Sequence, residues 1–171
     1  MMMLARFIIC QRGAAAAEMA LILPLAVLMI FSALEAGHYL YQEHQVTKGL
    51  RDSGRWAARQ SFDLINCRGG SASAIPTDTQ TAIKNLARTG KLSGGTARIA
   101  GWDSADITIE VDCPPPLPGE TDHTGIYDSG EPAARVTIST NFSYNSLFDG
   151  LGVLTDSVSL SGSHQATVMG I

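Results

Sequence analysis

The sequence lacks most of the residues and motifs that catalysis and metal binding require. Its 171 residues include only three cysteines and four histidines, and no CxxC, HExxH, GxSxG, P-loop or GxGxxG motif occurs. The acidic segment around Asp122, His123 and Asp128 could hold a cation, but it lacks the spacing of an EF-hand. We therefore expect no catalytic residue, no metal site, no cofactor and no small-molecule substrate.

Basic residues are nearly absent from the second part of the chain. Residues 99–171 contain only Arg135 against ten acidic residues, whereas residues 1–98 contain 11 basic and six acidic residues. Binding to nucleic acid requires a basic surface, so this distribution argues against a nucleic-acid partner. The acidic part is interpreted as a solvated surface, and the alternative is a surface that meets a basic partner.

Only one apolar run is long enough to cross a membrane. Residues 14–34 would form a helix about 31 Å long, which matches the hydrocarbon core of a bilayer. Arg6 and Arg12 precede this run, and no acidic residue occurs before Glu18. The positive-inside rule then predicts a single-pass protein with its N-terminus in the cytoplasm and the rest of the chain outside.

The start of the apolar run differs from an ordinary secretory signal. The segment RGAAAAE at residues 12–18 places a glycine and a carboxylate before the apolar core, and no clean cleavage site follows that core. This layout resembles a type IV prepilin leader, which a prepilin peptidase cuts after the glycine and which has Glu at the fifth mature position. Cleavage between Gly13 and Ala14 would make Glu18 that fifth residue.

Glu18 has the most distinctive chemistry in the chain. A charge inside a bilayer is costly and therefore indicates a function. After cleavage, the new amine of Ala14 would lie one helical turn away on the same face. A pair between Glu18 and the amine of this or a neighbouring subunit would set the register of stacked helices during assembly. The alternative is that Glu18 lies at the membrane surface and reaches cytoplasmic water.

The helical pattern continues beyond the apolar run. No proline occurs in residues 35–62, and an apolar stripe recurs at helical spacing. Its members are Tyr39, Val46, Leu50, Ser53 and Ala57. We expect one helix over residues 14–62, bent at Pro24 and weakened by its glycines Gly37, Gly49 and Gly54.

Four basic residues occupy the other surface of this expected helix, and we call them the basic ridge. They are Lys48, Arg51, Arg55 and Arg59. The ridge is interpreted first as a solvated face. The alternatives are an assembly surface, or a surface facing anionic lipid or acidic neighbours.

The remaining residues predict a small α+β domain. A Gly/Ser-rich break at 66–76 precedes a second helix, which starts at a capping box over residues 77–80 and ends before Gly90. Alternating residues predict strands over 96–100, 107–112, 135–141 and 158–168, the last interrupted at Gly162. The expected fold is a long N-terminal membrane helix followed by a domain with one further helix and an antiparallel sheet.

Two cysteines remain once a leader is removed. Cys10 lies within residues 1–13, whereas Cys67 and Cys113 would face an oxidising compartment where disulfides persist. A bond between them would close a loop of about 47 residues and stabilise the fold by about 4 kcal/mol. The alternative is two free thiols.

Three segments together resemble a known family. They are RGAAAAEMALILPL at 12–25, LEAGHYLY at 34–41 and RDSGRWAAR at 51–59, and they resemble TadE-like pseudopilins of tight-adherence (Flp-type) pilus systems. The resemblance implies a minor pilin-like subunit that a prepilin peptidase processes and that works with other pilin-like subunits and the tight-adherence secretion machinery. It also implies a single-pass protein of the inner membrane, with its N-terminus in the cytoplasm and its C-terminal domain in the periplasm. Met19 stands where major Flp pilins favour an aromatic, and the chain is far longer than theirs. The resemblance leaves open whether the subunit enters the pilus.

These patterns divide the chain into four expected parts. They are a prepilin-type leader (1–13), a transmembrane segment (14–34), an extracytoplasmic extension of the same helix (35–62) and a periplasmic α+β domain (63–171). A function of another class stays open, namely an uncleaved, membrane-anchored periplasmic binding or sensor domain. Processing separates the two, since the first requires a mature N-terminus at Ala14 and the second an intact Met1.

Overall fold

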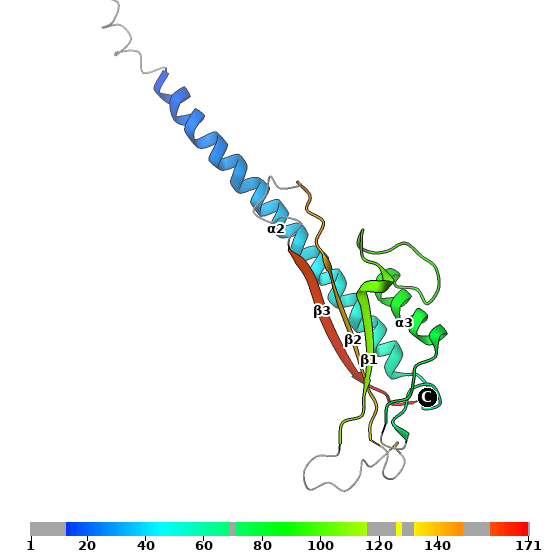
Figure 1. Ribbon diagram of the computed structural model, residues 1–171. Coiled ribbons are helices and arrows are strands. Elements are labelled where there is room, and N and C mark those ends of the chain that lie inside the picture. The colour runs from blue at the N-terminus through cyan, green and yellow to red at the C-terminus, as the bar shows by residue number, and fades with distance from the viewer. Residues whose placement is uncertain (1–12, 69–70, 116–125, 128–131, 149–157, 171) are drawn as a thin grey trace, which may run out of the picture.

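The computed structural model describes residues 13–68, 71–115, 126–127, 132–148 and 158–170. Within them lie two helices, α2 (Ala14–Ala58) and α3 (Thr77–Thr89), and a short 3-10 helix, η3 (Ser104–Asp106). Three strands follow, β1 (Ile107–Asp112), β2 (Arg135–Ser143) and β3 (Ser159–Thr167). The expected α+β fold with a long N-terminal helix is therefore confirmed (Figure 1).

Helix α2 is 45 residues long and continues through Pro24 as one helix. Its first half projects away from the rest of the molecule, and its second half lies against the sheet (Figure 1). The helix ends at Ala58, four residues before the predicted end. The chain turns there because the backbone N–H of Arg59 and the side chain of Gln60 both bond the carbonyl oxygen of Trp56, which is otherwise left without a partner at the helix end.

The sheet is antiparallel, with β2 between β1 and β3. Helix α2 runs along β3 in the same direction. Near the start of β3, the Tyr39 hydroxyl lies 3.5 Å from the carbonyl oxygen of Ser159, and beyond its end the N–H of Met169 donates to Ala58. Helix α2 and strand β3 therefore lie side by side over the second half of α2 (Figure 1).

The predicted apolar stripe of α2 forms one side of the core. Val46 and Leu50 are 1% exposed and Ala57 is fully buried, and they belong to the same cluster as Ile138 and Leu160 of the sheet. At about 25 cal/mol per Å² of buried apolar surface, side chains of this size each contribute roughly 1.5–3 kcal/mol. The spacing of the stripe therefore predicts correctly which face of α2 is covered.

Glycines that were expected to weaken or interrupt elements instead permit close packing. At Gly49, an added Cβ would meet the carbonyl oxygen of Ala87 in α3. At Gly162, a Cβ would lie 3.1 Å from Leu50 Cδ1, and β3 continues unbroken through this position, where it pairs with Thr140. The predicted interruption of β3 is therefore wrong. Gly49 lets α2 approach the backbone of α3, and Gly162 leaves room for the side chains of Leu50 and Val46.

Helix α3 confirms one predicted boundary and corrects the other. Gly90 has a φ of 76°, so it forms the left-handed C-terminal cap that was predicted. At the other end the cap residue is Pro76 and no side chain caps the helix, so the predicted capping box is wrong. Gln80 turns back instead, and its amide donates to the carbonyl oxygen of Ile75 at 2.9 Å.

The strand predicted over residues 96–100 is also wrong. Gly94, Gly95 and Gly101 around it have positive φ, which breaks an extended course. The N–H of Arg98 donates to the carbonyl oxygen of Arg88 at 2.8 Å, so this segment is held as coil against the end of α3.

Candidate functional site

The first half of α2 is apolar and uncovered. Leu21, Leu25 and Met29 are 79%, 62% and 67% exposed. Among the described residues, α2 is the one helix long and apolar enough to cross a membrane, with a mean hydropathy of 2.2 in a window that contains no buried residue. Exposed apolar surface of this extent needs a nonpolar neighbour. The helix therefore indicates single-pass membrane anchoring.

The two residues predicted to act at the start of α2 lie in open surroundings. Gly13 precedes the helix as its cap residue, and a Cβ added to it would meet nothing within 4 Å. Glu18 is exposed, and it forms no hydrogen bond or ion pair with any residue that the structure describes. Cleavage between Gly13 and Ala14 and pairing of Glu18 with an amine stay predictions.

A second acidic residue, Glu35, lies where the exposed half of α2 meets the domain. Its side chain is fully buried. Glu35 Oε1 accepts a hydrogen bond from the Tyr144 hydroxyl at 2.7 Å and from the backbone N–H of Leu147 at 3.1 Å. Both donors come from the segment that follows β2, so Glu35 joins α2 to the far end of the sheet.

Two further residues of α2 extend this contact into a polar chain. The Nδ1 of His38 lies 2.9 Å from the Tyr144 hydroxyl, and its Nε2 lies 3.1 Å from the amide nitrogen of Gln42. The donors and acceptors agree when neutral His38 carries its proton on Nδ1. Gln42 then donates to His38, His38 to Tyr144, and Tyr144 to Glu35. We call these four residues the junction cluster.

The junction cluster is mostly buried, with His38 half-buried, and it is only partly saturated. Glu35 Oε2 and Gln42 Oε1 are buried without a hydrogen-bond partner among the described residues. Burying a carboxylate is costly unless donors compensate for the lost water. The bonds from Tyr144 and Leu147 are therefore important for keeping Glu35 inside the protein.

Aromatic contacts flank the junction cluster on both sides. The rings of Tyr39 and Tyr144 meet edge to face with centroids 5.3 Å apart, and those of Phe31 and Phe148 at 4.8 Å. Such pairs contribute about 0.5–1.5 kcal/mol beyond their buried area. Together with Glu35, these contacts fix residues 144–148 along more than two turns of α2.

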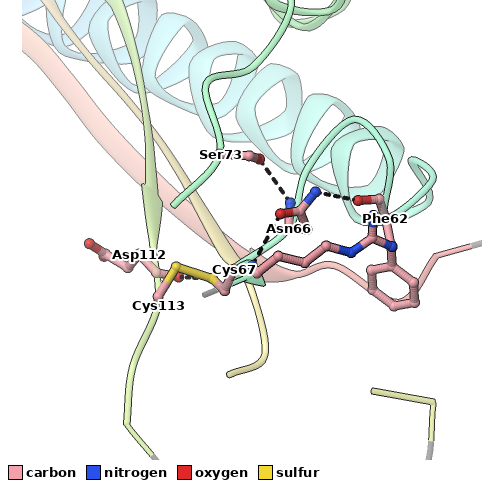
Figure 2. The surroundings of a disulfide bond; sticks show 7 residues. Phe62, Asn66, Cys67, Ser73, Asp112 and Cys113 are labelled. Carbon is pink, nitrogen blue, oxygen red and sulfur yellow. Dashed lines mark hydrogen bonds between the residues drawn. A yellow bond between two sulfur atoms is a disulfide. The ribbon is translucent and has the colours of Figure 1, made fainter. Parts of the chain in front are cut away.

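The structure contains the expected disulfide between Cys67 and Cys113, whose Cα atoms are 5.7 Å apart. The bond joins the loop after α2 to the end of β1 (Figure 2). Asn66 stiffens that loop, since its backbone N–H donates to Ser73 and its amide donates to the carbonyl oxygen of Phe62. The disulfide lies at the far end of the domain from Glu18.

The three histidines that the structure describes lie apart from one another. His38 belongs to the junction cluster, His44 is exposed, and His123 lies outside the described residues with its neighbours Asp122 and Asp128. His164, on β3, faces Gly54 of α2. Burial lowers the pKa of His164 below its ordinary value, and the nearby Arg51 and Arg55 lower it further. No group of three possible metal ligands occurs in the described part of the chain.

Sequence reasoning concentrated on Glu18 and missed Glu35. The available signal was the position of Glu35 directly after an apolar run long enough to cross a membrane. A helix that is simply exposed at this point would not require a charged residue there. Its partner Tyr144 is 109 residues away in sequence, so no local pattern joins the two.

The TadE-like protein family model matches residues 13–55, a segment that covers nearly all of α2 and includes Gly13, Glu18 and Glu35. The resemblance to TadE-like proteins is thereby confirmed for the long helix. This family suggests involvement in tight-adherence pilus assembly, in a structural and not a catalytic role. No curated protein and no solved structure matches the chain.

Proposed function

We propose that this protein is a minor pilin-like subunit that supports assembly of a tight-adherence pilus. The observation that carries the proposal is the match of residues 13–55 to TadE-like proteins. The matched segment is a helix whose apolar half is exposed and whose other half is built into a folded domain. A pilin-like subunit needs this combination, because the apolar helix anchors the subunit and the domain is exposed outside the membrane.

Processing by a prepilin peptidase between Gly13 and Ala14 is part of the proposal. Helix α2 starts at Ala14, so this cut would remove the leader and leave the helix whole. The mature chain would then have its span over residues 14–34 in the inner membrane and its domain, residues 63–171, in the periplasm. Residues 35–58 of α2 would form the extracytoplasmic extension.

Glu18 is proposed to act in assembly, where it neutralises the terminal amine of this or a neighbouring pilin-like subunit. The exposed position of Glu18 supports this role, because its carboxylate is free to meet a partner outside the chain. Two such charges attract strongly in a medium of low dielectric constant, and either one alone is costly there.

The junction cluster gives the long helix a mechanical role. Because Glu35 and Tyr144 fix the domain to α2, a neighbour that holds the apolar half also sets the position of the domain. A flexible linker between helix and domain would lose this coupling. The rigid connection supports a subunit that works in an ordered assembly.

Mass spectrometry of the mature N-terminus tests the proposal together with a count of surface pili. The membrane fraction and the sheared surface fraction of cells should contain a chain that starts at Ala14. Deletion of the gene should reduce pili sharply, and the intact gene should restore them. An intact Met1 together with normal pili in the deletion strain would favour a membrane-anchored binding or sensor domain instead.

A further inference from the structure

The basic ridge lies on the face of α2 opposite the buried stripe. Lys48, Arg51, Arg55 and Arg59 follow one another at steps of three or four residues, and all four are exposed. Residues at this spacing are neighbours on one side of a helix. The ridge is therefore a continuous row of cations along the outer surface of the helical layer.

No residue of the basic ridge forms a salt bridge within the described part of the protein. Arg68, Arg88 and Arg98 each form a salt bridge, with Asp63, Asp103 and Asp52 at 3.3, 3.2 and 3.4 Å. None of the four ridge residues does. Unpaired charges of one sign produce a potential that attracts an oppositely charged surface.

A membrane surface is too far away to be that partner. Lys48 follows Leu34, the end of the apolar run, by about 21 Å along the helix, and Arg59 follows it by about 37 Å. The headgroup layer adds only several Å to the hydrocarbon core, and salt screens charges beyond about 8–10 Å. The ridge therefore points to an acidic protein surface.

The outer face of the sheet carries carboxylates on the opposite side of the molecule. Glu110 and Asp112 of β1 are exposed, and they alternate with residues that face the core. Arg135 lies across from Asp112 on β2. The remaining outward side chains of β2 and β3 are uncharged, namely Thr137, Ser139, Asn141, Ser143, Ser159, Ser161, Ser163, Gln165 and Thr167.

The carboxylates and the ridge lie at matching levels along the molecule. Glu110 pairs with Thr137, which pairs with Gln165, and the neighbouring His164 faces Gly54 beside Arg55. Glu110 is therefore level with Arg55.

The second pair matches in the same way. Asp112 pairs with Arg135, which pairs with Thr167 at the end of β3. Two residues later, the N–H of Met169 bonds the carbonyl oxygen of Ala58, next to Arg59. Asp112 is therefore level with Arg59.

We infer that the basic ridge docks a second copy of this chain, with Arg55 and Arg59 of one copy facing Glu110 and Asp112 of the next. Matching levels allow this contact between copies that stand side by side in one membrane with parallel helices. The contact joins two different surfaces, so each added copy leaves one of each free and a row can grow. The inference rests on the proposed function, which supplies the membrane anchor. It specifies a second copy of the chain as the partner of the basic ridge.

Energy transfer between donor-labelled and acceptor-labelled full-length protein in vesicles of neutral lipid tests this contact. Arg55→Glu/Arg59→Glu and Glu110→Lys/Asp112→Lys should each weaken self-association at least tenfold. A mixture of the two variants should associate again, because a reversed ridge then meets a reversed face. Lys84→Glu/Lys91→Glu changes the net charge equally away from the ridge and should associate like the wild type.

Recovery in the mixture excludes misfolding as the cause of the losses. Wild-type association by the ridge variant would overturn the inference. So would failure of the mixture to recover, which would indicate that the ridge does not meet Glu110 and Asp112 of another copy. Absence of wild-type association in neutral lipid would overturn it too, and would indicate an acidic partner other than this chain or a requirement for anionic lipid. A failure of the proposed function looks different, since pili would then be normal without the gene while the purified protein still associated in vesicles.

Discussion

The hydroxyl of Tyr144 donates a hydrogen bond of 2.7 Å to Glu35 Oε1, and this contact joins two residues that lie 109 positions apart. Glu35 follows the apolar half of α2 directly, and Tyr144 follows the end of β2. Both side chains are fully buried. The bond therefore fixes the direction in which the exposed helix leaves the domain.

Removing the carboxylate at this junction should destabilise the protein. Glu35→Ala removes the carboxylate that accepts from the Tyr144 hydroxyl and from the Leu147 N–H, and hydrogen bonds to a charged group contribute about 1.5–3 kcal/mol each. We expect the free energy of unfolding of the purified protein in detergent to fall by about 2 kcal/mol or more. Glu43→Ala, an exposed glutamate on the same helix, is the control and should change it little.

Cleavage should depend on Gly13. A peptidase that cuts after this residue needs a position without a side chain, so Gly13→Val should leave a membrane-bound precursor that is heavier by the leader. Since a Cβ at Gly13 meets nothing within 4 Å, the fold itself should tolerate the change. Gly37→Val, in equally open surroundings, should be processed normally. Mature protein of normal mass from Gly13→Val would rule out the prepilin-type leader.

Assembly should depend on the charge of Glu18. Glu18→Gln keeps the shape of the side chain and leaves the terminal amine without its partner, a loss of about 3–5 kcal/mol in a buried pair. Association should fall more than about a hundredfold. The variant should be cleaved and inserted, yet produce few pili when it complements a deletion strain. Pili at wild-type number would show that Glu18 only reaches water at the membrane surface.

Loss of the disulfide should lower stability without changing membrane insertion. Cys67→Ser or Cys113→Ser opens a loop with a sequence separation of 46 residues, which should cost about 4 kcal/mol in the unfolding free energy. Alkylation of the unreduced mature protein should label neither cysteine. Ready labelling of both thiols in freshly isolated protein would contradict the bond.

His164 should make the fold sensitive to acid. Its pKa in the folded protein lies below its ordinary value of 6.5, first because of burial and then because of Arg51 and Arg55. The unfolded chain therefore binds a proton near pH 6.5 while the folded chain does not. Stability is complete above that pH and falls as the pH is lowered toward the folded pKa. The slope of unfolding temperature against pH should flatten in His164→Gln, whereas exposed His44→Gln should retain it.

Helical spacing and alternation predicted the regular elements well. The stripe through Val46, Leu50 and Ala57 identified the buried face of α2, because a helix of this length has one face to cover. Strands β1 and β2 likewise follow from alternation, which fixes which side chains face the core.

Some of the failures arise because a neighbour distant in sequence decided the outcome, whereas the capping box failed because of the adjacent Pro76. Gly162 was expected to interrupt a strand. It lies inside β3 instead, where the absence of a side chain makes room for Leu50 and Val46 of α2. Gln80 bonds the carbonyl oxygen of Ile75 instead of the helix start, since Pro76 takes the cap position. Glu35 was missed because Tyr144 lies beyond four other elements.

The close alignment of β3 with α2 determines when the core can close during synthesis. The buried stripe of α2 is made early, but Leu160, which covers it, belongs to the last strand of the described chain. Until that strand arrives, Val46 and Leu50 remain in water and β2 has an open edge. Helix α3 can pack on α2 earlier, but the face of α2 that Leu160 covers stays open until β3 has been made, and a product interrupted before β3 retains this exposed apolar surface.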